Sequence, residues 1–421
     1  MRKKVRDNKG SISTVVTVTV LFFTVILSTA YMVASTNRKT QIKSELVAKE
    51  TYEKTLSNLD EVREEITGLP KTDETQPYFP SSNFKRVAGT NLENGLVIED
   101  SEGNQYVWVE VPKNTTVYPT AGLNIANFTD DEYTKIENDL HTYTSVYRNN
   151  TTYSDTWAED TANEGWLTES EYYTLKKKML KSVYQNGGFY VGRYEAGIDS
   201  KKEQARNYGE DYTTLHETMQ KPVIKANAYP YTWVRRTQAQ QLAKSFFIEK
   251  SYTSSLMFGV QWDLVLAFMS KDSSKISSDL TELISNSTSI GNYRDSVFKL
   301  NPTSQYAIMS NWTLSTIWNS ATIPTSNFVD SNSNKMSQSS DGNCILVTTG
   351  TSEQNKVMNI YDIAGNAWEW TLEKTSNNSA PCTYRGGSCY YSGFIFPVAY
   401  RNDGPSVIYS FGDVGFRVSI Y

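Results

Sequence analysis

Histidine and cysteine are scarce in this chain of 421 residues. Its only histidines, His141 and His216, lie in unrelated sequence contexts, which argues against a histidine-rich metal site and against a Ser-His-Asp hydrolase. Three cysteines, Cys344, Cys382 and Cys389, are too few and odd in number for a disulfide-framework fold. Strong positive charge is also missing. Because the net charge is −5 and no domain is strongly basic, we expect no nucleic-acid partner.

Apolar residues are plentiful enough to build a core, at 38% of the chain. Tyrosine is unusually common, with 28 residues, and its polar-tipped ring suits contact surfaces. The predicted strands and helices follow one another without a regular strand-helix-strand alternation, so the sequence favours an α+β fold.

One apolar segment predicts a membrane anchor. Residues 12–34 carry no charged side chain and are long enough to cross a bilayer as a helix, with Thr and Ser bonding back to the helix carbonyls. Residues 1–11 contain five basic side chains and should stay in the cytoplasm. We therefore expect a single-pass protein of the cell membrane with a cytoplasmic N-terminus and an extracellular C-terminal domain.

Two alternatives remain for this segment. One is a cleaved secretory signal, although the apolar run is longer than a usual signal core and no small-x-small cleavage site follows it. The other is a minor pilin-like subunit, since Lys9-Gly10-Ser11 is similar to a prepilin processing site. Val15 stands where such sites carry glutamate.

Beyond the anchor the sequence predicts three regions. Residues 35–69 are charged and patterned for a helical stalk that stops at a Gly-Leu-Pro sequence. Residues 70–94 indicate a linker. The rest, 95–421, is expected to be one domain with a polar insertion at about 124–166.

Several elements of this domain can be predicted locally. Leu96–Ile98 and Tyr106–Val109 should pair as strands across a turn. Thr168 with Glu171 is a capping box at a helix start, and a strand should follow at Phe189–Glu195. We expect a second capped helix to begin near Thr237.

The last third of the chain carries four ordered motifs. They are NIYDIAGNAWEWT at 359–371, YRGGS at 384–388, AYR at 399–401 and GFR at 415–417. This set resembles the formylglycine-generating enzyme (sulfatase-modifying factor) family, which implies a C-type lectin-like fold for 95–421. From the residues themselves we expect Trp368, Trp370, Phe416 and Arg417 to be core, with Glu369 as a partner for Arg417.

The resemblance does not extend to the family's oxidative chemistry. Its oxidases hold copper with two cysteines in the third and eighth places after R-G-G-S, and here those places are Tyr391 and Phe396, which offer no thiolate. The related iron-dependent sulfoxide synthases need a histidine cluster. We expect no enzyme activity and no required cofactor; a divergent formylglycine-generating-type oxidase is the alternative.

Calcium is a separate expectation. The family binds it with the segment that matches G-N-x-W-E-W, and the corresponding positions here are Asp362, Gly365, Ala367 and Glu369. Oxygen ligands of this kind suit a hard cation. The alternative is that both carboxylates make ordinary hydrogen bonds within the fold.

Two stretches between the motifs are too apolar for ordinary loops, CYYSGFIF at 389–396 and SVIYSFGDV at 406–414. Every residue in them can be reached from the codon AAC by changing adenines, a pattern that resembles the variable regions of diversity-generating retroelement target proteins. If exposed, they form a contact surface for an external ligand, a protein or a cell-surface molecule; the alternative is a core strand with a polar loop. The candidate residues are Cys389, Tyr390, Tyr391, Ser392, Phe394, Ile395, Phe396, Asp403, Ser406, Ile408, Tyr409, Phe411 and Asp413. Cys382 and Cys389 could close a small loop.

Overall fold

The computed structural model describes residues 19–28, 43, 68–148, 153–162, 164–199, 220–246, 252–311, 313–325, 327–338, 342–402 and 406–421. The chain divides into two compact units, Met1–Gly68 and Leu69–Tyr421. In the first unit, residues 19–28 are helical, and Thr24 Oγ1 donates to the Val20 carbonyl at 2.7 Å, as expected for threonine in such a helix. The predicted basic segment, 1–11, and most of the predicted anchor and stalk, 12–18, 29–42 and 44–67, lie outside the described part. Among the described residues no helix has the length and apolar character needed to cross a membrane.

The second unit is built around a six-stranded sheet. Its order is β1 (Lys85–Arg86), β2 (Val97–Glu99), β3 (Gln105–Glu110), β4 (Gly188–Gly192), β19 (Ser419–Ile420) and β7 (Ser254–Ser255). All neighbours pair antiparallel, and the predicted hairpin is confirmed by the β2–β3 pairing. The last strand of the chain lies between β4 and β7, so the C-terminus is fixed inside the sheet.

The predicted linker, 70–94, is wrong as a domain boundary. Leu69 and Thr75 are buried. The Thr75 hydroxyl accepts a hydrogen bond from Trp108 Nε1 at 2.7 Å and donates to the Gly187 carbonyl at 2.9 Å. Because β1 also joins the main sheet, the domain begins at about Leu69. Prolines and small polar residues here mark a stretch of irregular backbone that packs on the sheet.

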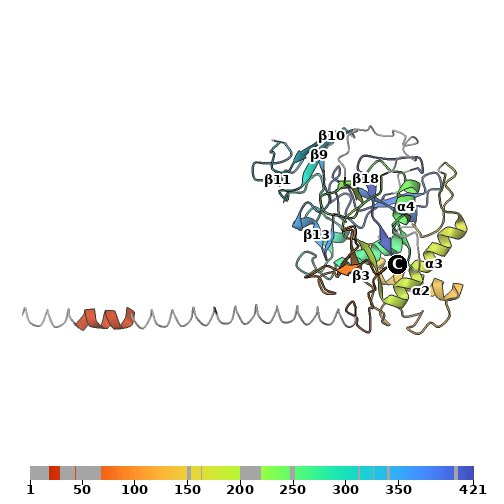
Figure 1. Cartoon of the computed structure of the whole chain (residues 1–421), viewed down its shortest axis with the longest axis horizontal. Helices are drawn as coiled ribbons and strands as arrows, with labels where there is room; N and C mark the ends of the chain where they lie inside the picture. The colour runs from red at the N-terminus through yellow and green to blue at the C-terminus, as the bar shows by residue number, and fades with distance from the viewer. Residues whose placement is uncertain are drawn as a thin grey trace, which may run out of the picture. The chain divides into compact units, whose positions relative to one another are not determined.

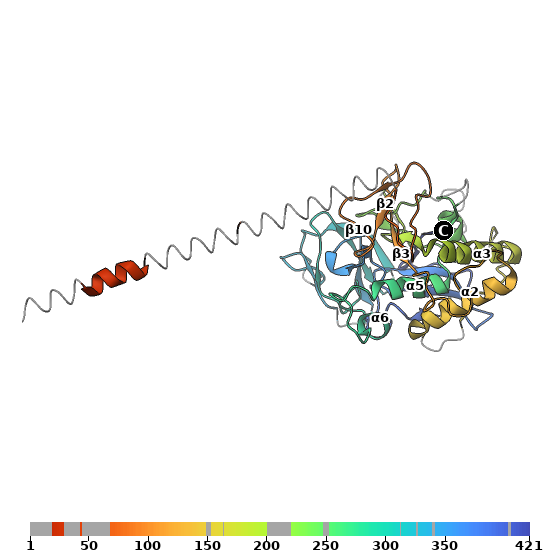
Figure 2. The same ribbon diagram turned by 90° about the horizontal axis from the view of Figure 1, so that it is seen from below.

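Two long helices lie side by side, α2 (Asp130–Tyr143) and α3 (Glu169–Asn186), as Figures 1 and 2 both show. The predicted capping box of α3 is confirmed, with Glu171 N–H donating to Thr168 Oγ1 at 3.3 Å and Thr168 N–H to Glu171 Oε2 at 2.8 Å. α2 falls inside the predicted polar insertion, which therefore contains a capped helix. Its narrow apolar side, Ile136 and Leu140, is buried.

Three further helices are α4 (Arg236–Lys244), α5 (Gly259–Met269) and α6 (Thr281–Ile284). The second capped helix, predicted to begin near Thr237, begins at Arg236. Gln238 Oε1 accepts the Arg235 N–H at 3.0 Å, so the cap is Arg235. α5 is buried on nearly all sides, which explains why its sequence shows no amphipathic period.

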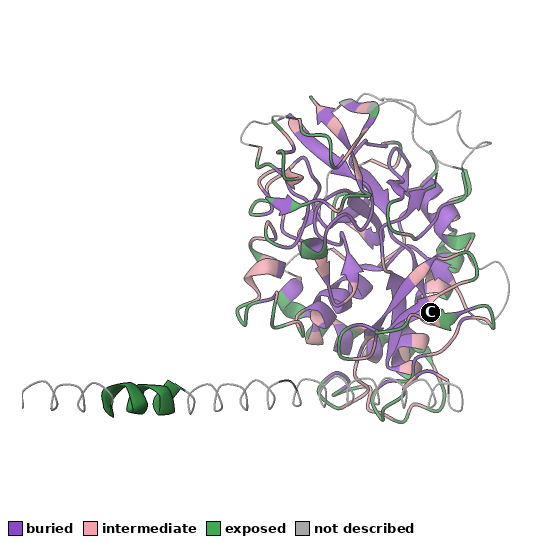
Figure 3. Cartoon of the chain, turned by 60° about the vertical axis from the view of Figure 1, so that its left-hand side comes forward, coloured by how far each residue is buried: buried purple, intermediate pink, exposed green. Residues whose placement is uncertain are grey.

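The C-terminal motifs build a second, four-stranded sheet. Its order is β17 (Arg401–Asn402), β16 (Cys382–Arg385), β15 (Trp368–Lys374) and β18 (Val414–Phe416). The strands of a three-stranded sheet precede these motifs in the sequence. Its order is β10 (Thr313–Ser320), β9 (Gln305–Ser310) and β12 (Asn343–Val347). Short pairs complete the fold: β5 (Gly197–Ile198) with β6 (Tyr229–Pro230), β8 (Phe298–Lys299) with β11 (Asn334–Lys335), and β13 (Lys356–Val357) with β14 (Ile360–Tyr361). Strands and helices are thus mixed without alternation, and the predicted α+β class is confirmed; Figure 3 shows most strands buried.

The motif arginines are core residues. Arg417 donates to both oxygens of Glu369, its Nε lying 3.0 Å from each, which confirms the predicted pair. Arg401 and Arg385 share the carboxylates of Asp263 and Glu373, with Arg385 Nη2 at 3.0 Å from Asp263 Oδ1 and Arg401 Nε at 2.8 Å from Glu373 Oε1. These four side chains are almost completely buried. Buried charges of this kind must be paired. The arginines of the R-G-G-S and A-x-R motifs therefore have a structural role in this ion-pair network.

Candidate functional site

The first candidate stretch, 389–396, leaves β16 through a double-glycine turn. Gly386 and Gly387 both have positive φ, +98° and +77°, and a Cβ on Gly387 would lie only 2.7 Å from the Phe396 carbonyl oxygen. The returning chain is held by main-chain hydrogen bonds to segment 287–294: the Arg294 N–H donates to the Tyr391 carbonyl at 2.8 Å and the Ser287 N–H to the Gly393 carbonyl at 3.0 Å. The loop is therefore fixed to the scaffold at several points.

Its side chains divide between surface and interior. Phe394 is 69% exposed and Ile395 is 55% exposed. Tyr391, Ser392 and Phe396 are half-buried, and Ser392 Oγ donates to Asp295 Oδ2 at 2.6 Å. Two adjacent large apolar side chains thus project from an anchored loop, where a partner could contact both.

The second candidate stretch is described from Ser406 onward, and Asp403 lies outside the described residues. Ile408 is 46% exposed, and Ser406 and Tyr409 are half-buried. Deeper in the stretch, the Trp233 N–H donates to the Phe411 carbonyl at 2.9 Å. Trp233 holds a φ of +60°, which a bulky residue adopts only where its surroundings enforce it. Sequence inspection gave no sign of this supporting role.

Four of the predicted contact residues are buried and cannot reach a ligand as the chain is folded. They are Cys389, Tyr390, Phe411 and Asp413. Their partners lie in the interior: Ser388 Oγ donates to Asp413 Oδ2 at 2.7 Å, Cys389 Sγ lies 3.2 Å from Cys344 Sγ, and the Phe411 ring lies 6.4 Å from that of Tyr384. The expected surface of thirteen residues is therefore narrower, and these four support it from the interior.

An aromatic cluster connects the two stretches beneath the surface. It runs from Tyr409 through Phe411, Tyr384, Trp368 and Phe396 to Tyr400, with successive ring centroids 5.8, 6.4, 4.9, 5.5 and 4.8 Å apart. Tyr391 joins it at 4.6 Å from Phe396. Such contacts hold side chains in defined rotamers. We call the accessible residues of the two stretches, including the cluster members Tyr391, Phe396 and Tyr409, the C-terminal face: Tyr391, Ser392, Phe394, Ile395, Phe396, Ser406, Ile408 and Tyr409.

The buried Asp413 carboxyl makes the base of this face sensitive to pH. Burial raises the pKa of Asp413 to about 6, against the lowering effect of the Ser388 hydroxyl. The folded chain therefore binds this proton more tightly than the unfolded chain, whose carboxyl pKa is about 4. The group favours folding below pH 4, and this contribution is lost as the pH rises to about 6.

We expect Asp413→Asn to remove this loss. The variant should gain stability over the natural chain between pH 4 and 6, with an upper bound of about 3 kcal/mol at pH 7, and show no gain at pH 3.5. Urea unfolding of both chains at several pH values measures the difference. A difference that does not change with pH would contradict a buried, ionised Asp413.

The residues predicted for calcium are differently engaged. Asp362 Oδ2 accepts the Gly350 N–H at 2.6 Å, and among the described residues no donor reaches its buried Oδ1. Burial raises the pKa of Asp362 to about 6 and that of Glu369 to about 7. Gly365 and Ala367 lie in the turn between them, where Gly365 has a φ of +71°.

This set fits a cation only in part. The unpaired Asp362 oxygen suits one, but both Glu369 oxygens already accept from Arg417. A third carboxyl, Glu195, accepts from Asn366, and its pKa is raised well above the usual range by burial and by repulsion from Asp362 and Glu369. Calcium binding stays a prediction. Glu195 was missed because it lies 167 positions before Asp362 in the sequence, and only the fold brings them together.

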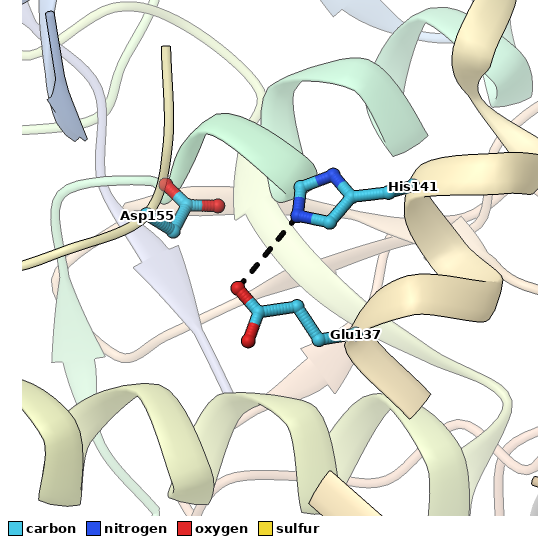
Figure 4. A group of neighbouring side chains, drawn as sticks. All are labelled: Glu137, His141 and Asp155. Atoms are coloured by element: carbon cyan, nitrogen blue, oxygen red, sulfur yellow. Dashed lines mark ion pairs between the residues drawn. The ribbon is translucent and has the colours of Figure 1, made fainter. Parts of the chain in front are cut away.

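A second cluster, Glu137, His141 and Asp155, brings three potential metal ligands together (Figure 4). Each is already bonded within the protein. Lys176 Nζ lies 2.8 and 2.9 Å from the Glu137 oxygens, Arg148 Nη1 lies 2.7 Å from His141 Nδ1, and Asp155 accepts the first N–H groups of α5 at 2.7 and 2.9 Å. With two cations already beside it, the cluster is a helix cap and ion-pair network.

Comparison of the chain with family models, with curated proteins and with solved structures gives no match in any of the three.

Proposed function

We propose that this chain is a membrane-anchored surface protein whose C-terminal domain binds an external ligand through the C-terminal face. In this proposal the domain is of the C-type lectin-like, formylglycine-generating-enzyme type, and the basic N-terminus stays in the cytoplasm. The ligand is a protein or another cell-surface molecule.

The observation that carries the proposal is the contrast between a fixed frame and exposed apolar tips. Phe394, Ile395 and Ile408 are 69%, 55% and 46% exposed, although the loops that carry them rest on a packed aromatic cluster. Side chains held on a rigid frame lose little entropy on binding, and a few well-packed anchors, often aromatic, carry most of the binding energy of an interface. Nearby Tyr391 and Tyr409 add hydroxyl groups that can form directional hydrogen bonds with a ligand.

An oxidase function finds no support in the same residues. The two places that hold copper ligands in the family's oxidases are Tyr391 and Phe396 in this chain, and their rings pack against each other at 4.6 Å. Neither side chain can form a thiolate. We therefore propose binding without catalysis.

Variation by adenine mutagenesis can be tested at the gene. We expect deep sequencing of the 3′ end in a growing population to show substitutions concentrated within codons 389–396 and 406–414, at positions that are adenine in a nearby template repeat. Codons 359–371 serve as the internal control, because they encode buried core. An even distribution of substitutions, with no reverse transcriptase gene nearby, would contradict this part of the proposal and leave ligand binding to be tested separately.

A further inference from the structure

Two cysteines far apart in the sequence meet in the core. Cys344 lies in β12 and Cys389 follows the double-glycine turn, 45 positions later, and their Sγ atoms are 3.2 Å apart. Both side chains are completely buried. A disulfide needs about 2.0 Å between the sulfurs, so closing the remaining gap takes a small side-chain rotation. Cys389 itself is held by its N–H, which donates to the Asn366 carbonyl at 3.0 Å.

A buried cation lies beside this pair. Lys335 Nζ donates to the carbonyls of Tyr293 and Ser296 at 2.7 and 2.8 Å, which fixes the ammonium in place. It interacts electrostatically with both cysteines. Burial raises the pKa of the Cys389 thiol well above its usual value, and the Lys335 ammonium opposes this only in part. Because thiol–disulfide exchange proceeds through the thiolate, the bond should form while the pair is transiently exposed.

The third cysteine is placed elsewhere. Cys382 stands at the opposite end of β16, where it pairs in register with Lys374, and the charges acting on it are those of Arg236 and Asp160. The expected Cys382–Cys389 loop is therefore not the pairing that this fold favours. Cys389 belongs with Cys344.

We propose that Cys344 and Cys389 form a disulfide when the domain folds in an oxidising compartment. One thiolate attacks a small-molecule disulfide and releases one thiol; the second cysteine then attacks the mixed disulfide and releases the other. The two cysteines lose two protons and two electrons, which end on the two released thiols. The bond joins β12 to the base of the 389–396 loop. In a living cell this rests on the proposed extracellular location, but the pairing itself does not.

The test uses the full-length chain in detergent, purified under reducing conditions. Incubation with reduced and oxidised glutathione, just below the denaturant midpoint, exposes the buried thiols transiently. After alkylation in strong denaturant, peptide mass spectrometry should find Cys344 joined to Cys389, lighter by two hydrogen atoms, and Cys382 alkylated. Alkylation of both Cys344 and Cys389, or a Cys382–Cys389 link, would overturn the proposal without affecting the C-terminal face.

Matched variants separate the bond from general damage. In the oxidised natural chain and in Cys382→Ser, a phosphine reductant should lower the melting temperature by several degrees, on the order of 5 °C. In Cys344→Ser the reductant should cause no shift. An equal shift in all three chains, or none in any, would show that no such bond stabilises the fold.

Discussion

Replacing Arg417 with methionine is expected to lower the free energy of unfolding by about 3–5 kcal/mol. The guanidinium donates to both oxygens of Glu369 and to the carbonyls of Gly192 and Tyr361, at 2.8 and 2.9 Å. Without it, Glu369 is left as a buried and unpaired acid in the neighbourhood of Asp362 and Glu195. Urea unfolding followed by tryptophan fluorescence measures the loss.

A double-mutant cycle controls for lost packing. Glu369→Gln combined with Arg417→Met removes both charges. We expect this double variant to be more stable than Arg417→Met alone by at least about 1 kcal/mol. If the second substitution makes the protein less stable still, the pair is not an isolated charge couple. That result would favour a further partner for the Glu369 carboxylate, such as the cation of the calcium prediction.

The largest effect on binding is expected from the exposed tips of the C-terminal face. Serine at Phe394 and Ile395 removes the two most exposed apolar side chains of the face without touching the aromatic cluster below. Truncation of a hot-spot residue costs at least about 2 kcal/mol, or roughly thirty-fold in affinity. We expect the double variant to lose at least that factor in retention on any cell surface that retains the natural chain.

Ile317→Ser is the matched control for this measurement. Ile317 is 62% exposed on β10 and lies outside both candidate stretches. Both variants should keep the melting temperature of the natural chain, because surface substitutions change stability by less than about 0.5 kcal/mol. Equal retention by Phe394→Ser/Ile395→Ser and Ile317→Ser would mean that binding, if present, uses another surface.

Elements that carry their own signals could be predicted from the sequence. The α3 capping box depends on Thr168 and Glu171 alone, and the β2–β3 hairpin depends on a turn between two apolar runs. The Glu369–Arg417 pair could be predicted because a buried arginine requires an acidic partner. On a strand, Glu369 also points away from the two tryptophans beside it.

Other features depend on contacts between segments that are distant in the sequence, and local sequence patterns do not predict such contacts. Residues 70–94 resemble a linker in composition, yet Thr75 is bonded to Trp108 and Gly187 in the core. The polar segment 124–166 contains α2, which was not predicted because only a narrow stripe of its residues is buried. Cys344 and Cys389, and likewise Glu195 and Asp362, meet only because the sheets bring them together.

Within the candidate stretches, composition alone could not separate exposed from buried residues. Phe394 and Phe411 are the same residue type and have similar neighbours in the sequence, but Phe394 is 69% exposed and Phe411 is 7% exposed. The Phe411 ring packs against those of Tyr384 and Tyr409, at centroid distances of 6.4 and 5.8 Å, whereas the Phe394 side chain projects from its loop. Neither stretch has a helical or strand period from which this division could be read.

Hydroxyl-radical footprinting of the full-length chain, free and bound to a cell surface that retains it, shows which residues the ligand covers. If the C-terminal face contacts the external ligand, protection on binding is concentrated in residues 391–396 and 406–409, while Ile317, exposed on β10, reacts equally in both states. Unchanged reactivity of Phe394 and Tyr409 on binding, with protection elsewhere on the domain, would contradict this contact.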